Sequence, residues 1–178
     1  MTPVDTPAPA ALGLRLAAGL FIVGPALIHI AVVPQHLATY VPYGIFLLAV
    51  GLAQLVLATA VLLRPSPPLL IGGAAAMLAV VAVWIFSRTT GMPVGPSAWY
   101  REPIRLTDLL TSLMELVAVV LLLVADARLE SRRPFRPLRT APGLAVTLVA
   151  SAGLTLAALA GVTAADHCWR RCSPGARR

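Results

Sequence analysis

Residues 42–63 read PYGIFLLAVGLAQLVLATAVLL and contain no Asp, Glu, Lys or Arg. The hydrocarbon core of a bilayer is about 30 Å thick, and a helix needs about 20 apolar residues to cross it. A soluble helix would alternate apolar and charged faces, and this stretch has no charged face. The segment therefore predicts a membrane-spanning helix, and Arg64-Pro65 at its end predicts a tight turn.

The rest of the chain repeats this pattern on both sides of that segment. Hydrophobic residues make up 58% of the sequence and charged residues 12%, unlike the composition of soluble domains. We predict an all-α, polytopic membrane helical bundle with about five transmembrane helices and a transmembrane region at 11–164. A disordered leader at 1–10 precedes it, and a basic tail at 165–178 with Cys168 and Cys172 follows it. The predicted spans are 11–33, 42–63, 69–86, 104–124 and 141–164.

The net charge of +7 comes from arginine, because the sequence contains no lysine. The arginines lie between apolar spans and in the tail, which favours a lipid bilayer with anionic head groups as partner and argues against nucleic acid. Membrane protein partners or a homo-oligomer are further partners to expect. The arginines divide equally between the two membrane sides, so their density in the loop at 125–140 indicates a cytoplasmic N-terminus in a bacterial cell membrane.

Two carboxylates lie inside the fourth predicted span, where a charge costs about 2.5–3.5 kcal/mol on insertion scales. Asp108 and Glu115 are seven residues apart, which returns them to one helix face. Thr111 and Ser112 fall between them on the same side. The fourth span therefore carries a polar stripe on the half nearest the 87–105 loop.

Topology brings other polar residues towards the same membrane side. We predict a polar pocket, open to the outer face, that binds an unidentified cofactor; its candidate residues are His29, Gln54, Arg88, Asp108 and Glu115. His36, in the predicted 34–41 link, joins His29 and Glu115 as a candidate metal ligand, since imidazole and carboxylate together suit a borderline metal ion. No residue is assigned a catalytic role.

Each candidate also has a structural interpretation. Arg88 with Asp108 or Glu115 is equally an ion pair that locks two helices, and Gln54 an interhelical hydrogen-bond donor. His29 fits a satisfied interfacial histidine, and His36 a solvent-exposed one. Cys168 and Cys172 form a C-x3-C pattern compatible with a disulfide, a weak metal site or neither. The repeat of Thr147, Ser151 and Thr155 indicates helix packing.

The first half resembles the DoxX-type family of small four-helix bacterial membrane proteins. The resemblance rests on Leu14-Arg-Leu-Ala-Ala-Gly-Leu-Phe21, on His29 followed by Pro34, and on Gly51 with Gln54. It covers about residues 11–90, and it departs from the family at Gln54, where an acidic residue is often found. The resemblance implies a redox-associated membrane subunit. The second half resembles uncharacterised bacterial multi-pass membrane proteins.

Three function classes follow from these observations. The first is an accessory membrane subunit whose outward-facing pocket holds a metal, cofactor or proton linked to redox or stress chemistry. The second is a small proton-linked carrier in which Glu115 and Asp108 relay protons. The third is a structural subunit of a larger membrane complex. The sequence lacks the P-loop, dinucleotide-binding, H-E-x-x-H and G-x-S-x-G motifs, so whether the chain is an enzyme stays open.

Overall fold

The computed structural model describes residues 9–131, 146–147 and 149–160. Four helices dominate it: α1 (Pro9–Thr39), α2 (Val41–Leu63), α3 (Pro67–Thr89) and α4 (Leu106–Ser131). All four are long and apolar enough to cross a membrane. Large hydrophobic side chains such as Val56 and Leu63 are exposed, as expected for surfaces that face lipid. The chain is therefore an all-α, multi-pass integral membrane protein.

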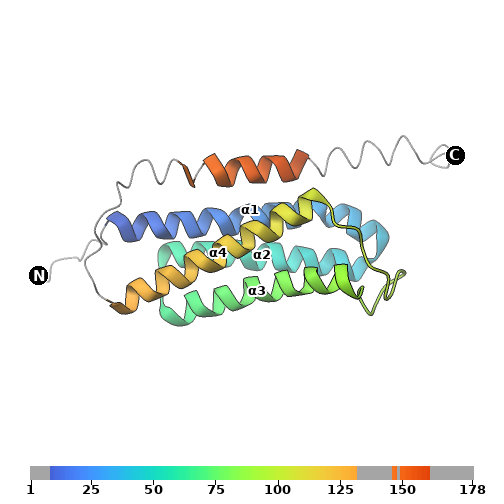
Figure 1. Ribbon diagram of the computed structural model, residues 1–178, viewed down its shortest axis with the longest axis horizontal. Coiled ribbons are helices and arrows are strands. Elements are labelled where there is room, and N and C mark those ends of the chain that lie inside the picture. The colour runs from blue at the N-terminus through green and yellow to red at the C-terminus, as the bar shows by residue number, and fades with distance from the viewer. Residues whose placement is uncertain (1–8, 132–145, 148, 161–178) are drawn as a thin grey trace, which may run out of the picture.

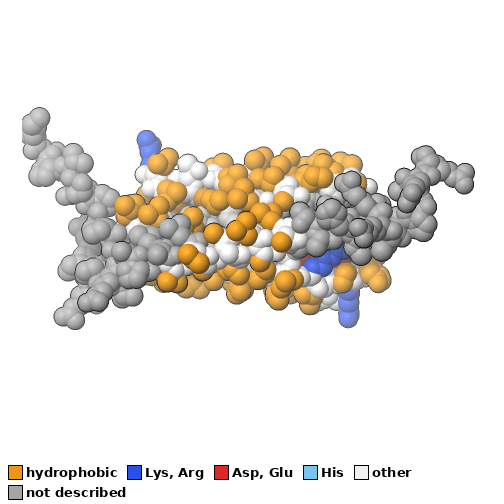
Figure 2. Space-filling model, turned by 90° about the horizontal axis from the view of Figure 1, so that it is seen from above, with side chains coloured by type: hydrophobic (Ala, Val, Ile, Leu, Met, Phe, Trp, Pro, Cys, Tyr) orange, Lys and Arg blue, Asp and Glu red, His pale blue; other side chains and the backbone are white. Residues whose placement is uncertain are grey.

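The helices run up and down in turn, and α4 crosses the others obliquely (Figure 1). α1 packs against α2 and α4, and α3 packs against α4, whereas α2 and α3 meet over only a small region. The core consists mainly of small and medium apolar side chains from all four helices, including Ile22, Val61, Leu70 and Leu122. Figure 2 shows hydrophobic side chains along the length of the face in view, with arginines near its two ends.

The first helix is longer than the sequence indicated. Pro34 was expected to end it near Val33, but Pro25 and Pro34 both lie inside α1, which continues to Thr39. A proline in a helix removes one backbone hydrogen bond and crowds the preceding turn, but the following turn can still close. Here Tyr40 N donates to His36 O at 2.8 Å. His36 therefore lies in the last turn of α1 and not in a link.

A shorter apolar helix, Val149–Ala160, packs along α1 and α4. Ser151 Oγ donates to Leu20 O at 3.1 Å, so one residue of the polar repeat lies where this helix packs on α1. Gly24 allows the close approach, because a Cβ there would overlap Met114 Cε and lie 2.6 Å from Thr155 Oγ1. A crossing by the whole predicted span at 141–164 stays a prediction, because its two ends lie outside the described residues.

Other predictions fall wholly outside that part of the chain. They concern most of the leader at 1–10, the arginine-dense half of the 125–140 loop, and the tail with Cys168 and Cys172.

The connection between α3 and α4 folds over the end of the bundle. Gly91 (φ 81°) turns the chain so tightly that a Cβ would lie 2.6 Å from the carbonyl carbon of Trp99. Trp99 N donates to Met92 O at 2.8 Å, and Glu102 N to Ser87 O at 3.2 Å. Tyr43 Oη of α2 donates to Val94 O, which ties the loop to the second helix. The 90–105 loop is thus a folded cap over the helix ends.

Candidate functional site

Glu115 lies at the centre of a polar chain to which every one of the four long helices contributes. Its side chain is only 1% exposed. His29 Nε2 of α1 lies 3.1 Å from Glu115 Oε1, and Gln54 Nε2 of α2 donates to the same oxygen at 2.8 Å. Gln54 Nε2 also lies 3.5 Å from Met77 Sδ of α3. Two helices, α1 and α2, thus supply polar partners to one buried carboxyl group of α4, and α3 adds a sulfur contact to Gln54.

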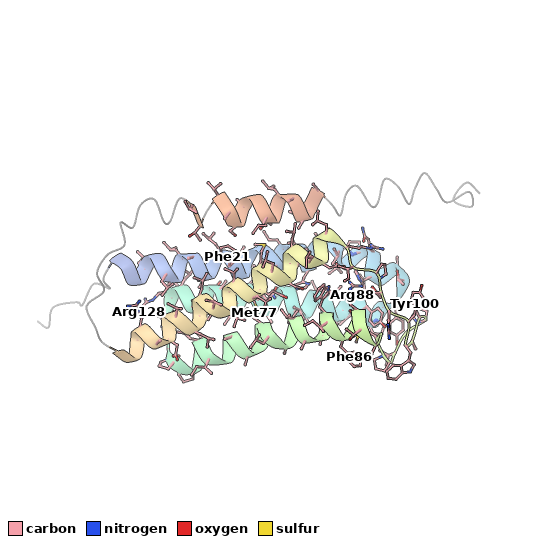
Figure 3. All side chains as sticks on the ribbon, viewed as in Figure 1. Phe21, Met77, Phe86, Arg88, Tyr100 and Arg128 are labelled. Atoms are coloured by element: carbon pink, nitrogen blue, oxygen red, sulfur yellow. The ribbon has the colours of Figure 1, made fainter. Side chains whose placement is uncertain are left out.

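Arg88 organises a second polar group closer to the end of the bundle. Its Nη2 donates to Asp108 Oδ2 at 2.6 Å and its Nη1 to Glu102 Oε2 at 2.9 Å. The Arg88 side chain is 12% exposed, whereas that of Glu102 is 48% exposed. Arg88 therefore connects α3 both to α4 and to the 90–105 loop. Figure 3 shows Arg88 and Tyr100 towards one end of the bundle, Met77 near mid-length and Arg128 towards the other end.

A cavity of about 190 Å³ lies between these two polar groups. Its wall includes His29, Arg88, Asp108 and Glu115, together with Thr111 and Ser112 of the predicted polar stripe. Apolar side chains such as Phe46 and Val83 complete the wall. We call this space the polar cavity. It lies at the loop-capped end of the bundle, with Glu115 as its deepest ionisable group.

Two residues that line the polar cavity each carry a buried donor that no described protein atom satisfies. Trp84 Nε1 and Arg88 Nε are buried, and neither has a hydrogen-bond partner there. A buried N–H without an acceptor costs about 1–3 kcal/mol. An oxygen atom of a water molecule or a ligand in the cavity would recover that free energy. The cavity therefore suits a guest that carries hydrogen-bond acceptors.

The structure brings most of the predicted residues together, but it changes their pairing. His29, His36, Arg88, Asp108 and Glu115 all line the polar cavity, whereas Gln54 contacts Glu115 from behind it. Arg88 pairs with Asp108 and Glu102 among the described residues, and not with Glu115. Asp108 and the His29–Glu115 pair therefore line the same cavity, as predicted for one site, but they do not contact each other directly.

The proposed metal ligands do not converge in the described part of the chain. That part contains no group of three or more His, Cys, Asp or Glu side chains arranged to hold a metal ion. His36 Nδ1 donates to Val32 O at 2.9 Å within its own helix, which engages one of its two ring nitrogens. Metal binding by His29, His36 and Glu115 stays a prediction that this geometry does not favour.

Sequence reasoning missed Met77, Glu102 and Trp84 as parts of the site. Met77 and Trp84 lie in an apolar run and carry no polar pattern, so nothing in the sequence distinguished them from core or interface residues. Glu102 lies in the loop that was expected to connect α3 to α4. Its position beside Arg88 depends on how the loop folds back over the helix ends. In the sequence, only Gly91 and the loop prolines indicate that the loop turns.

The fold and the site together define a class: a small polytopic α-helical membrane protein with a buried carboxyl–imidazole pair beneath a capped polar cavity. No family model, curated protein or solved structure matches the chain.

Proposed function

We propose that this protein is a membrane subunit whose polar cavity binds a small acceptor-bearing ligand and exchanges a proton at the Glu115–His29 pair. The burial of Glu115 supports the proposal most strongly. A carboxyl group inside a membrane-spanning helix is expensive, and such residues face a cavity or a partner and mark ion or proton paths. Glu115 has both a cavity and a partner, because it lines the polar cavity and contacts His29.

The chemistry of the pair allows a proton to be gained and lost without breaking the contact. When the carboxyl group is ionised, an N–H at His29 Nε2 can donate to Oε1; when it is protonated, its O–H can donate to an unprotonated Nε2. Gln54 Nε2 donates to Oε1 at 2.8 Å and holds the carboxyl group in place. His29 lines the cavity as well, so it offers a route for the proton between Glu115 and the cavity interior.

The class of ligand follows from the unsatisfied donors. Trp84 Nε1 and Arg88 Nε favour a carbonyl, carboxylate or other acceptor oxygen. The apolar part of the wall favours a guest that also has a hydrocarbon or aromatic portion. The DoxX-type resemblance of residues 11–90 adds a link to redox chemistry to this proposal.

Infrared spectroscopy of the protein in lipid vesicles tests the proton site without knowledge of the ligand. We expect a carboxylic-acid C=O band that changes in intensity as the bulk pH is changed and that is absent from Glu115→Gln. Glutamine keeps the size of the side chain and an acceptor oxygen, so the bundle should remain folded. The control is Asp126→Asn, at the opposite end of α4, which should retain the band. A Glu115 band that does not respond to pH would leave the carboxyl group a structural element and refute proton exchange.

A further inference from the structure

A second cavity, of about 440 Å³, lies between α2 and α3. Its walls are mostly apolar and include Ala53 and Leu57 of α2 and Gly72, Ala76 and Val80 of α3. We call it the α2–α3 groove. Ala53, Gly72 and Ala76 are exposed, so the groove opens sideways from the bundle. A Cβ added at Gly72 would have no atom within 4 Å, which shows open space at this wall.

One residue in the wall of this groove carries a buried polar atom that has no hydrogen-bond partner among the described residues. Gln54 is 4% exposed and lines the groove. Its Nε2 is turned towards Glu115 and Met77, whereas its Oε1 has no hydrogen bond from any described residue. Leaving a buried amide oxygen without a donor costs free energy. A guest in the groove that carries an O–H would supply the missing donor.

The depth of Gln54 limits what that guest can be. Gln54 lies thirteen residues from the first residue of α2 and nine from the last, or about 20 Å and about 14 Å along the helix axis. It is therefore near the middle of the span, where no bulk water reaches the backbone or side chains. A charged lipid head group is too costly to place there. The donor must belong to an uncharged molecule that dissolves in the membrane interior.

We infer that the α2–α3 groove binds an uncharged, hydroxyl-bearing lipid whose O–H donates to Gln54 Oε1 while its hydrocarbon part lies between α2 and α3. The volume is within the range of about 300–1,000 Å³ typical of small-molecule sites. The groove and the polar cavity share Val80 in their walls, and Gln54 contacts Glu115 directly. This lipid site does not depend on proton exchange at Glu115.

Photolabelling in phosphatidylcholine vesicles tests the site with a matched pair of probes. One probe is a diazirine-bearing hexadecanol, and the other is its methyl ether, which lacks the donor. We expect the alcohol to label groove residues about threefold to tenfold more than the ether, as one hydrogen bond predicts. Gln54→Leu should remove this preference. Ala76→Leu, which fills the groove, should reduce labelling by both probes.

The controls separate this site from general lipid contact and from the proposed proton site. Ala75→Leu makes the same change on an exposed neighbour that does not line the groove, and it should leave labelling unchanged. Glu115→Gln should keep the preference for the alcohol even if it abolishes the infrared signal. Equal labelling by alcohol and ether would overturn the proposal. So would cross-linking of the groove to a second copy of the chain in place of lipid.

Discussion

At the residue scale, Glu115 is a buried carboxyl group whose burial must be compensated by polar partners. Removing one partner of a buried polar pair leaves the other without compensation, which costs more than the pair itself contributes. Glu115 Oε1 is contacted by both His29 and Gln54, so each partner alone satisfies it incompletely. The three side chains therefore form one unit, and substitutions within it should not act independently.

A double-mutant cycle between His29→Ala and Glu115→Gln measures this coupling. We expect the two changes in the free energy of unfolding to be non-additive by about 0.5–3 kcal/mol, the range for residues in contact. The measurement is denaturant unfolding of the purified protein in detergent. As a control, His29→Ala should combine additively with Asp126→Asn, which lies near the other end of α4. Additivity in both pairs would mean that His29 and Glu115 contribute separately.

At the element scale, Arg88 determines how the 90–105 loop and α4 are attached to α3. Its two ion pairs are not equivalent, because Asp108 is 28% exposed and Glu102 is 48% exposed. An exposed ion pair contributes about 0–1 kcal/mol, whereas a hydrogen bond to a charged group in a less hydrated place contributes about 1.5–3 kcal/mol. The link to α4 should therefore dominate the stability, and the link to Glu102 should mainly order the loop.

We expect Asp108→Asn to lower the free energy of unfolding by about 1.5–3 kcal/mol and Glu102→Gln by no more than about 1 kcal/mol. The unfolding midpoint in detergent checks the first effect. Limited proteolysis at the exposed Arg105 checks the second, since a loosened loop should be cut faster by trypsin in Glu102→Gln than in the unmodified protein. Equal destabilisation by both substitutions would contradict the difference in burial.

At the scale of the whole molecule, the orientation in the membrane decides which compartment the polar cavity faces. The cavity lies at the end capped by the 90–105 loop, and α4 runs from that end to the other end of the bundle (Figure 1). Arginine-dense loops are retained in the cytoplasm. The sequence predicts that the 125–140 loop is cytoplasmic, and we therefore expect the polar cavity to open to the outside.

Thiol labelling of intact cells tests this orientation. In a background with Cys168→Ser and Cys172→Ser, a membrane-impermeant maleimide should label Ser97→Cys in intact cells. It should label Arg132→Cys only after the cells are permeabilised. Ser97 is exposed in the loop, so access to it does not require a conformational change. The reverse pattern would place the cavity on the cytoplasmic side, and labelling of both sites in intact cells would disprove a crossing by α4.

The membrane class and the existence of the four long helices were already determined by the sequence. A stretch such as 42–63 must form a helix in the membrane, because the hydrocarbon core offers no water and its backbone N–H and C=O groups must bond to each other within the segment. The polar face of α4 was predictable for a related reason, since the helical repeat alone puts Asp108 and Glu115 on one side. Even His29 could be assigned the right end of the bundle from topology.

Tertiary structure decided which of these groups touch. Arg88 contacts Asp108 and Glu102, Gln54 and His29 share one oxygen of Glu115, and the sparse contact between α2 and α3 leaves a groove beside Gln54. Helical periodicity determines only the face on which a side chain lies. Its partner depends on how far each helix rotates, slides and tilts against its neighbours. Those degrees of freedom are settled by many small packing contacts, such as the one Gly24 allows, and no single segment of the sequence encodes them.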